Sequence, residues 1–353
     1  MPRIVNSVAP IRICDNGGWS DTWFARYGKV FNIAVSPCVE VQIEAFARSD
    51  DRARVTIHAE NYGESYCLNH PVLQYDKHPL LEAAVDFMGI PEDVSVEVSI
   101  FSEAPSGCST GTSAAVSVAL IAALDRLTPG VLTPHEIAAS AHRIESELLR
   151  QQSGIQDQIA SAHGGINFID MYEYPHASVT QIPVCDEIRW ELEGRLSLLY
   201  VGQTHSSSAI HEMVIRDLED AGPEAPKMAS LRTTAEQARA ALMAADFEEF
   251  GRSMIANTQA QQELHPELIG ERHHQIIEIA AAYGAIGWKV NGAGGAGGSV
   301  TLLSGGERKQ KRAMLRAIEE ANPEFRKIPI ALERNGVRTW VTSVGSLTGT
   351  NSR

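Results

Sequence analysis

The sequence predicts two domains, each a mixture of α-helices and β-strands, and three observations support this. The chain has 353 residues, of which 44% are hydrophobic, so it can bury one large core or two moderate ones. In its first third, apolar and polar residues alternate as they do in strands with one buried face. The second half runs strand, helices, two strands, helix and two closing strands, which suits a sheet with helices packed on one face. The acid-rich stretch 186–193 is the predicted boundary, giving domains 1–190 and 191–353.

Three strands are predicted in the first third, at residues 39–45, 55–59 and 94–100, because apolar and polar side chains alternate there. A turn rich in Gly, Ser and Thr follows at 106–113. Residues 114–126 are then nearly continuous in Ala, Val and Leu, which predicts a buried helix that begins at the turn.

A further helix is predicted from Thr133 to about Arg150, because Thr133 suits the N-cap, Pro134 the first position and Glu136 the third. The following segments are predicted from the same kinds of pattern: a short helix from residue 155 to 164, strands at 167–169 and 196–201, helices at 232–260 and 270–283, strands at 286–290 and 299–303, and a helix at 307–321. The tail 348–353 is expected to fray.

Composition excludes several classes of partner. A formal net charge of −14 repels nucleic acid and anionic membranes, so a bound phosphate must be held by local groups. No run approaches the roughly 18 apolar residues of a membrane helix, and the N-terminus does not resemble a signal peptide. The five cysteines form no C-x-x-C pair, and no H-E-x-x-H occurs, so neither a disulfide framework nor a zinc site is expected. We therefore expect a soluble cytoplasmic protein with no nucleic-acid or membrane partner; homo-oligomerisation stays open.

The stretch 103–115 lies between a strand and an apolar helix and is suited to phosphate. Small residues let the backbone wrap round a ligand, and the free N–H groups of a helix start attract anions. The residues expected to hold the phosphate are Pro105, Ser106, Gly107, Cys108, Ser109, Thr110, Gly111, Thr112 and Ser113. The segment 107–111 is also a literal G-x-S-x-G, the pattern of a hydrolase with Ser109 as nucleophile. Pro105 and Ser106 argue against this, because the strand of a nucleophile elbow runs directly into the first glycine.

A second glycine-rich stretch, 291–298, contains G-x-G-x-x-G, which in a dehydrogenase would bind a dinucleotide. That fingerprint must open a helix, whereas a strand is predicted at 299–303. We expect instead a turn whose backbone comes very close to another loop or to a ligand.

A third stretch, 9–22, places charged and amide groups around Gly17 and Gly18, as suits a polyhydroxylated ligand. Between the stretches 103–115 and 291–298 lie Glu145, in the capped helix, and Asp157, at the start of the next helix. Taken alone, such residues are usually surface or helix-end charges.

Together these loops resemble the GHMP kinases, named for galactokinase, homoserine, mevalonate and phosphomevalonate kinases, over residues 9 to 303. Residues 9–12 are similar to the motif A-P-G-[RK], 105–115 to P-x-G-x-G-L-G-S-S-x-A, and 289–298 to K-x-x-G-A-G-G-G-G. Within the family, 17–22 is close to the fucokinase pattern and 144–158 to the heptose-7-phosphate kinases. Both of those kinases phosphorylate an anomeric hydroxyl.

The resemblance implies a two-domain GHMP kinase fold: an N-terminal α/β domain of the ribosomal-protein-S5-like type that holds ATP, and a C-terminal ferredoxin-like α+β domain. It implies that Arg12 and Asp157 are catalytic, with Asp157 accepting the substrate's proton. It also implies that Glu145 and either Thr112 or Ser113 bind magnesium. Ser109, Thr110 and Ala296 depart from the family pattern.

The implied activity is transfer of the γ-phosphate of ATP, with Mg²⁺, to a sugar hydroxyl, most plausibly the anomeric one. The residues expected to bind the sugar are Gly18, Trp19, Ser20, Asp21, Gly292 and Gly294. The alternative is a sensor on the same fold that binds sugar and ATP without turnover, and the presence of both Arg12 and Asp157 argues against it.

Overall fold

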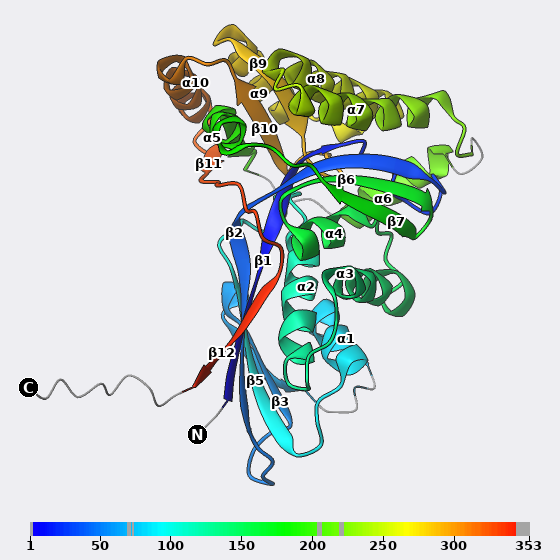
Figure 1. Ribbon diagram of the computed structural model, residues 1–353, viewed down its shortest axis with the longest axis vertical. Coiled ribbons are helices and arrows are strands. Elements are labelled where there is room, and N and C mark those ends of the chain that lie inside the picture. Colours follow the sequence, from blue (N-terminus) through cyan, green and yellow to red (C-terminus); the bar gives the residue numbers. More distant parts are fainter. Residues whose placement is uncertain (1–2, 69–71, 73, 203–206, 219–221, 344–353) are drawn as a thin grey trace, which may run out of the picture.

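The computed structural model describes residues 3–68, 72, 74–202, 207–218 and 222–343. Within them the chain forms an eight-stranded sheet and a four-stranded sheet, which lie one above the other along the long axis of the molecule (Figure 1). The tail expected to fray lies outside the described residues. No described helix is both long and apolar enough to cross a membrane.

The larger sheet has the strand order β12-β1-β2-β5-β3-β4, with β6 and β7 continuing from β2. Its strands are β1 (Arg3–Asn16), β2 (Gly28–Ala47), β3 (Val55–Ala59), β4 (Glu64–Leu68), β5 (Val94–Ser102), β6 (Ile166–Glu173), β7 (His176–Gln181) and β12 (Arg338–Ser343). The long strand β2 pairs with β5 through residues 39–47 and with β6 through residues 28–33. A register shift between Pro10 and Ile11 interrupts the β1–β2 ladder just before Arg12.

Helices cover one face of this sheet (Figure 1). They are α1 (Pro79–Met88), α2 (Thr112–Asp125), α3 (Pro134–Arg143) with the π-helical turn η2 (Ile144–Leu148), and α4 (Gln156–His163). The start of α3 is capped as predicted: the Glu136 N–H donates to Thr133 Oγ1 at 3.3 Å, and the Thr133 N–H donates to Glu136 Oε2 at 2.8 Å. Helix α2 is buried almost throughout, which its apolar sequence predicts.

The smaller sheet has the order β11-β8-β10-β9. Its strands are β8 (Leu196–Tyr200), β9 (Ala285–Val290), β10 (Ser299–Ser304) and β11 (Arg326–Ile328). The helices of this half are α5 (Asp186–Arg195), α6 (Ser207–Leu218), α7 (Pro226–Met243), α8 (Phe247–Leu264), α9 (Glu271–Ala282) and α10 (Arg308–Ala321), and the short 3₁₀ turns of the chain are η1 (Glu60–Tyr62) and η3 (Pro266–Leu268).

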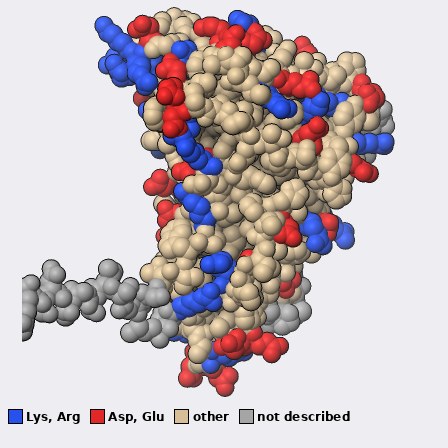
Figure 2. Space-filling model, in the orientation of Figure 1, with Lys and Arg blue, Asp and Glu red and all other residues tan. Residues whose placement is uncertain are grey.

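Helix α10 shows why the surface carries a local basic patch on an acidic protein. Its buried side chains are Met314, Leu315 and Ile318, and its exposed basic residues are Arg308, Lys309, Arg312 and Arg316, whereas the Lys311 ammonium donates to the Gly194 and Leu196 carbonyls. Figure 2 shows blue side chains gathered near this helix, at the upper left, while both signs of charge are scattered over the rest of the visible face.

The two halves are packed together rather than joined only by the chain. Helices α7 and α8 both contact β1 and α7 also contacts β2, and the rings of Phe31 and Phe250 meet edge to face with centroids 5.5 Å apart. The cavity described below is therefore built from both halves.

The predicted strands and helices are confirmed with two corrections. The acid-rich stretch 186–193, for which only a domain boundary was predicted, is helix α5, in which Asp186 and Glu187 occupy the first turn, where carboxylates are favourable. The predicted helix 232–260 is divided at Ala245, which has φ 55°, and α8 restarts with Asp246 as its N-cap. The division near residue 190 stays a prediction, but β12 pairs with β1 and so belongs to the larger sheet. Strands β1, β4 and β7 and helices α1 and α6 were not predicted.

Candidate active site

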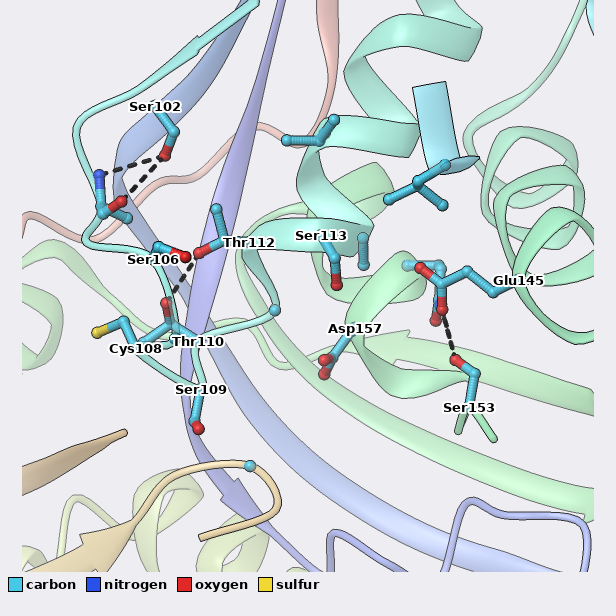
Figure 3. A pocket seen from close by; sticks show the side chains of 18 of the residues that line it. Ser102, Ser106, Cys108, Ser109, Thr110, Thr112, Ser113, Glu145, Ser153 and Asp157 are labelled. Carbon is cyan, nitrogen blue, oxygen red and sulfur yellow. Dashed lines mark hydrogen bonds between the residues drawn. The ribbon is translucent and has the colours of Figure 1, made fainter. Parts of the chain in front are cut away.

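A cavity of about 770 Å³ opens where the loop before α2, the start of α4, the loop after β1 and the β9–β10 turn meet. Figure 3 shows it from close by, with the phosphate-loop residues on one side and Glu145 and Ser153 on the other. It brings together residues from both ends of the chain.

Arg12 and Asp157 form a bidentate ion pair at the centre of this cavity. Arg12 Nε lies 2.7 Å from Asp157 Oδ1 and Nη2 lies 3.1 Å from Oδ2, while Nη1 donates to the Ser109 carbonyl. Arg12 is only 3% exposed and Asp157 is 28% exposed. Burial alone would lower the pKa of Arg12, but Asp157 and Asp15 raise it above its ordinary value, so the guanidinium stays charged.

The start of α2 suits an anion, and its shape depends on Gly111. Gly111 has φ +71°, and no side chain caps the helix, so the first N–H groups are left for a ligand. A Cβ at position 111 would lie 3.2 Å or less from the carboxyl carbon and oxygen of Asp157. Only glycine therefore lets this loop lie against the Arg12–Asp157 pair.

The two hydroxyls at the start of α2 point in different directions. Thr112 Oγ1 lies 3.4 Å from Thr110 Oγ1 and is turned back toward the loop. Figure 3 shows the Ser113 hydroxyl on the other side, pointing into the space that it shares with Asp157 and Glu145.

Glu145 lies in the π-helical turn η2, a feature that often marks functional sites. Its Oε2 accepts from Ser153 Oγ at 2.6 Å and from Gln158 Nε2 at 2.9 Å. Its Oε1 is buried without a hydrogen-bond partner among the described residues. Burial raises the pKa of Glu145 to about 7, with a further contribution from Asp157.

This donor set fits a hard cation such as Mg²⁺. A buried carboxylate oxygen without a partner is costly, and a cation would satisfy it. Within the described part of the chain, no group of three or more His, Cys, Asp or Glu side chains could hold a metal ion. The ion would therefore rest on Glu145, a hydroxyl and oxygens of the nucleotide and water, as Mg²⁺ commonly does.

Asp21 has a structural role in addition to lining the cavity. Its Oδ2 accepts from the N–H groups of Ile155 at 2.9 Å and Gln156 at 3.0 Å, so it caps helix α4, which carries Asp157. A Cβ at Gly154 would lie 2.2 Å from the same oxygen, so glycine is required there. Burial raises the pKa of Asp21 to about 6.

A second buried ion pair, close to the Arg12–Asp157 pair, joins the two halves. Lys289 Nζ lies 3.2 Å from Asp15 Oδ1, and Asp15 Oδ2 accepts from the Gly292 N–H at 2.9 Å. A Cβ at Gly292 would lie 2.8 Å from the Ser109 carbonyl oxygen. The expectation that the glycine-rich turn approaches another loop closely is thus confirmed.

Most of the predicted site residues line this cavity. They are Arg12, Trp19, Asp21, all nine residues from Pro105 to Ser113, Glu145, Asp157 and Gly292. Gly18, Ser20 and Gly294 are not among the lining residues. The Ser20 hydroxyl donates to the Gly17 and Lys29 carbonyls at 2.7 and 3.1 Å, and Gly294 lies against the Leu268 carbonyl.

Other lining residues were not predicted, among them Asp15, Asn61, Tyr62, Lys77, His78, Gln152 and Gln156. Asp15, Gln152 and Gln156 lie within the stretches 9–22 and 144–158 that the sequence analysis singled out, so a signal for them was present. Asn61, Tyr62, Lys77 and His78 come from separate segments whose local sequence carries no sign of a ligand.

Comparison with known proteins agrees with this fold. A family model described as the GHMP kinases N terminal domain matches residues 79–165. The chain is 25% identical over 344 residues to D-glycero-alpha-D-manno-heptose 7-phosphate kinase of Campylobacter jejuni, covering 96% of this chain and 99% of that one. It is 28% identical over 342 residues to mevalonate kinase of Pyrococcus abyssi, covering 89% and 93%.

A third relative, the bifunctional fucokinase/GDP-fucose pyrophosphorylase of Arabidopsis thaliana, is 26% identical over 340 residues. The match covers 92% of this chain but only 32% of that protein, so the chain spans about a third of its length. Among solved structures, a D-glycero-D-manno-heptose 1-phosphate kinase from Bacteriodes thetaiotaomicron superposes with a TM-score of 0.74 at 21% identity, covering 95% of this chain and 98% of that one.

The fold and the loops therefore define a small-molecule kinase that uses ATP and acts on an alcohol. The chain belongs to the GHMP kinase family and has its two-domain fold.

Proposed function

We propose that this protein is a cytoplasmic sugar kinase that transfers the γ-phosphate of ATP to the anomeric hydroxyl of its substrate. The observation that carries the proposal is the bidentate Arg12–Asp157 pair, which lies directly against the uncapped start of α2. A kinase needs positioned positive charge and a proton acceptor at the same point, and this pair supplies both.

Each catalytic group has a role that follows from its surroundings. The N–H groups of Thr112 and Ser113 would hold the phosphates, and Arg12 would neutralise charge that develops on the transferred group. Glu145 and Ser113 would hold Mg²⁺, and the orientation of the two hydroxyls favours Ser113 over Thr112. When bound, Mg²⁺ neutralises phosphate charge. Asp157 would accept the proton of the substrate's hydroxyl.

The choice of a sugar rests on relatives as well as on geometry. Two relatives are named for sugar substrates, fucose and a heptose 7-phosphate, and both loops that resemble them, 17–22 and 144–158, border the cavity. The mevalonate kinase relative provides the rival acceptor. An anomeric hydroxyl is more acidic than other sugar hydroxyls, so an aspartate accepts its proton more readily. The five cysteines are free, as suits a reducing cytoplasm.

A coupled ADP-release assay over free sugars, sugar phosphates and mevalonate tests the activity, with the Asp157→Asn protein as the control for contaminating kinases. Phosphorus NMR of the product then tests the regiochemistry. A resonance coupled to the anomeric proton supports the proposal, and coupling to a terminal CH₂ contradicts the choice of hydroxyl. Turnover of mevalonate alone would refute the sugar kinase, and binding of sugar and ATP without ADP release would favour the sensor.

A further inference from the structure

One end of the cavity, here called the acceptor end, is formed by Trp19, Asp21, Thr22, Gln152, Ser153 and Gln156. Ser153 lies on the side of Asp157 away from the phosphate loop (Figure 3), and none of the six residues is Lys or Arg. We infer that the acceptor is a neutral sugar, which carries neither a phosphate nor a carboxylate. This inference rests on the proposed function, because it assumes that the acceptor binds beside Asp157.

The first argument is the placement of positive charge. Among the described residues that line the cavity, Arg12 and Lys77 are the only Lys or Arg. Arg12 is already engaged by Asp157 and the Ser109 carbonyl, and Lys77 lies over the ring of Tyr66, 4.9 Å from its centroid, on the β4 side. The residues outside the described part contain no lysine and a single arginine, Arg353. A phosphate on the acceptor would therefore have no Arg or Lys partner among the residues lining the cavity, although proteins usually bind phosphate with such a cation.

The second argument is the negative charge that is already present. Asp15, Asp21, Glu145 and Asp157 line the same cavity; Asp15 is paired with Lys289 and Asp157 with Arg12, whereas the almost fully buried Asp21, at the acceptor end, accepts from backbone N–H groups. Like charges repel strongly where water is excluded. An acceptor that added a phosphate or a carboxylate here would raise this repulsion, whereas a neutral one would not.

The third argument is the kind of hydrogen bond that the acceptor end offers. An ionised Asp21 can only accept, and Gln156 Oε1 is buried without a partner among the described residues. These groups require a ligand that donates. Sugar hydroxyls donate, whereas a phosphate dianion or a carboxylate only accepts.

The nearest cation along the chain at this end is Arg150, which precedes Gln151 and Gln152. It is exposed and does not line the cavity. Arg150 is therefore the cation nearest in sequence that could contact a phosphorylated acceptor from outside the cavity lining, and the Arg150→Gln protein tests that contact.

The experiment measures kcat/KM with MgATP for neutral hexoses, 6-deoxyhexoses and heptoses, for the terminal phosphate ester of each, and for mevalonate. We expect the best neutral sugar to exceed its own phosphate ester by about 100-fold or more, as unfavourable burial of a charge predicts. Its KM should change by less than about twofold between 20 and 300 mM KCl, because screening does not act on a neutral ligand. The Arg150→Gln protein should give values within about twofold of the unmodified protein for every acceptor.

Higher kcat/KM for a phosphate ester, with a KM that rises with salt or with Arg150→Gln, would overturn the inference and leave the sugar kinase intact. If mevalonate were the best acceptor, both the inference and the sugar kinase would fall. If no member of the panel released ADP, the proposed function would fail and the inference with it.

Discussion

Replacing Glu145 by Gln should make the protein more stable at alkaline pH while weakening its use of magnesium. Burial raises the pKa of Glu145 from an ordinary 4.5 to about 7. Each pKa unit is worth about 1.4 kcal/mol, so ionising this group in the folded protein costs about 3 kcal/mol more than in the unfolded chain. The folded protein binds the proton more tightly. The stability that the bound proton on Glu145 gives to the folded protein is therefore complete below the unfolded pKa, and it is lost as the pH rises through about 7.

The assay is urea unfolding without metal or nucleotide, at pH 5 and at pH 8. Glu145→Gln keeps an oxygen for the Ser153 and Gln158 donors, so it should be more stable than the unmodified protein at pH 8 by about 1–3 kcal/mol. At pH 5 the two proteins should differ little. Glu147→Gln is the matched control, since Glu147 is 61% exposed and pairs with Arg143 on the surface. It should show no such dependence on pH.

Glu145→Gln should stabilise the fold at alkaline pH but weaken the use of magnesium in catalysis. Between pH 8 and pH 6 the ionised fraction of a group with a pKa near 7 falls about tenfold, so the magnesium requirement of the unmodified enzyme should rise by a similar factor. In Glu145→Gln the requirement should be higher at both values and should not vary in this way. Equal stability at pH 8 together with an unchanged magnesium titration would refute the reasoning and make Glu145 a purely structural residue.

Three further predictions concern the residues around it. Asp157→Asn should lower kcat by about 10²–10⁴, because it removes a proton acceptor but little volume. ATP binding, measured by calorimetry, should stay nearly intact. A kcat within about threefold of the unmodified protein would remove Asp157 from the mechanism. Gly111→Ala should lower kcat at least about tenfold and destabilise the fold by about 1 kcal/mol, because an L-residue is strained at φ +71° and its Cβ would press on Asp157. Asp21→Ala should raise the sugar KM and also destabilise the protein by about 1–2 kcal/mol in urea unfolding, because Asp21 caps α4. A rise confined to the ATP KM would contradict its place at the acceptor end.

The parts of the fold that the sequence predicted are those set by neighbouring residues. The alternation in β2, β3 and β5, the apolar run of α2 and the capping box at Thr133 are all local signals, and each gave the right element. The stretch 186–193, predicted only as a domain boundary and found as helix α5, shows the limit of composition, because an acidic run is compatible with both a linker and a helix. Leu192, its fully buried residue, packs into a core that the sequence does not display.

The features of the site likewise divide into those set by local sequence and those set by tertiary packing. The sequence by itself determined the three loops and the order of Arg12, Glu145 and Asp157, because each loop has the small residues and charges that its chemistry needs. Only the tertiary structure decided which groups meet. Asp21 caps a helix 134 positions away, β12 returns to pair with β1 across almost the whole chain, and Asp15 finds Lys289 in the other half. Whether Ser113 or Thr112 points toward Glu145 depends on the rotation of α2, which follows from the left-handed turn at Gly111. The lack of a cation at the acceptor end is likewise a property of packed surfaces, since the arginines and lysines of a sequence carry no indication of which cavity they line.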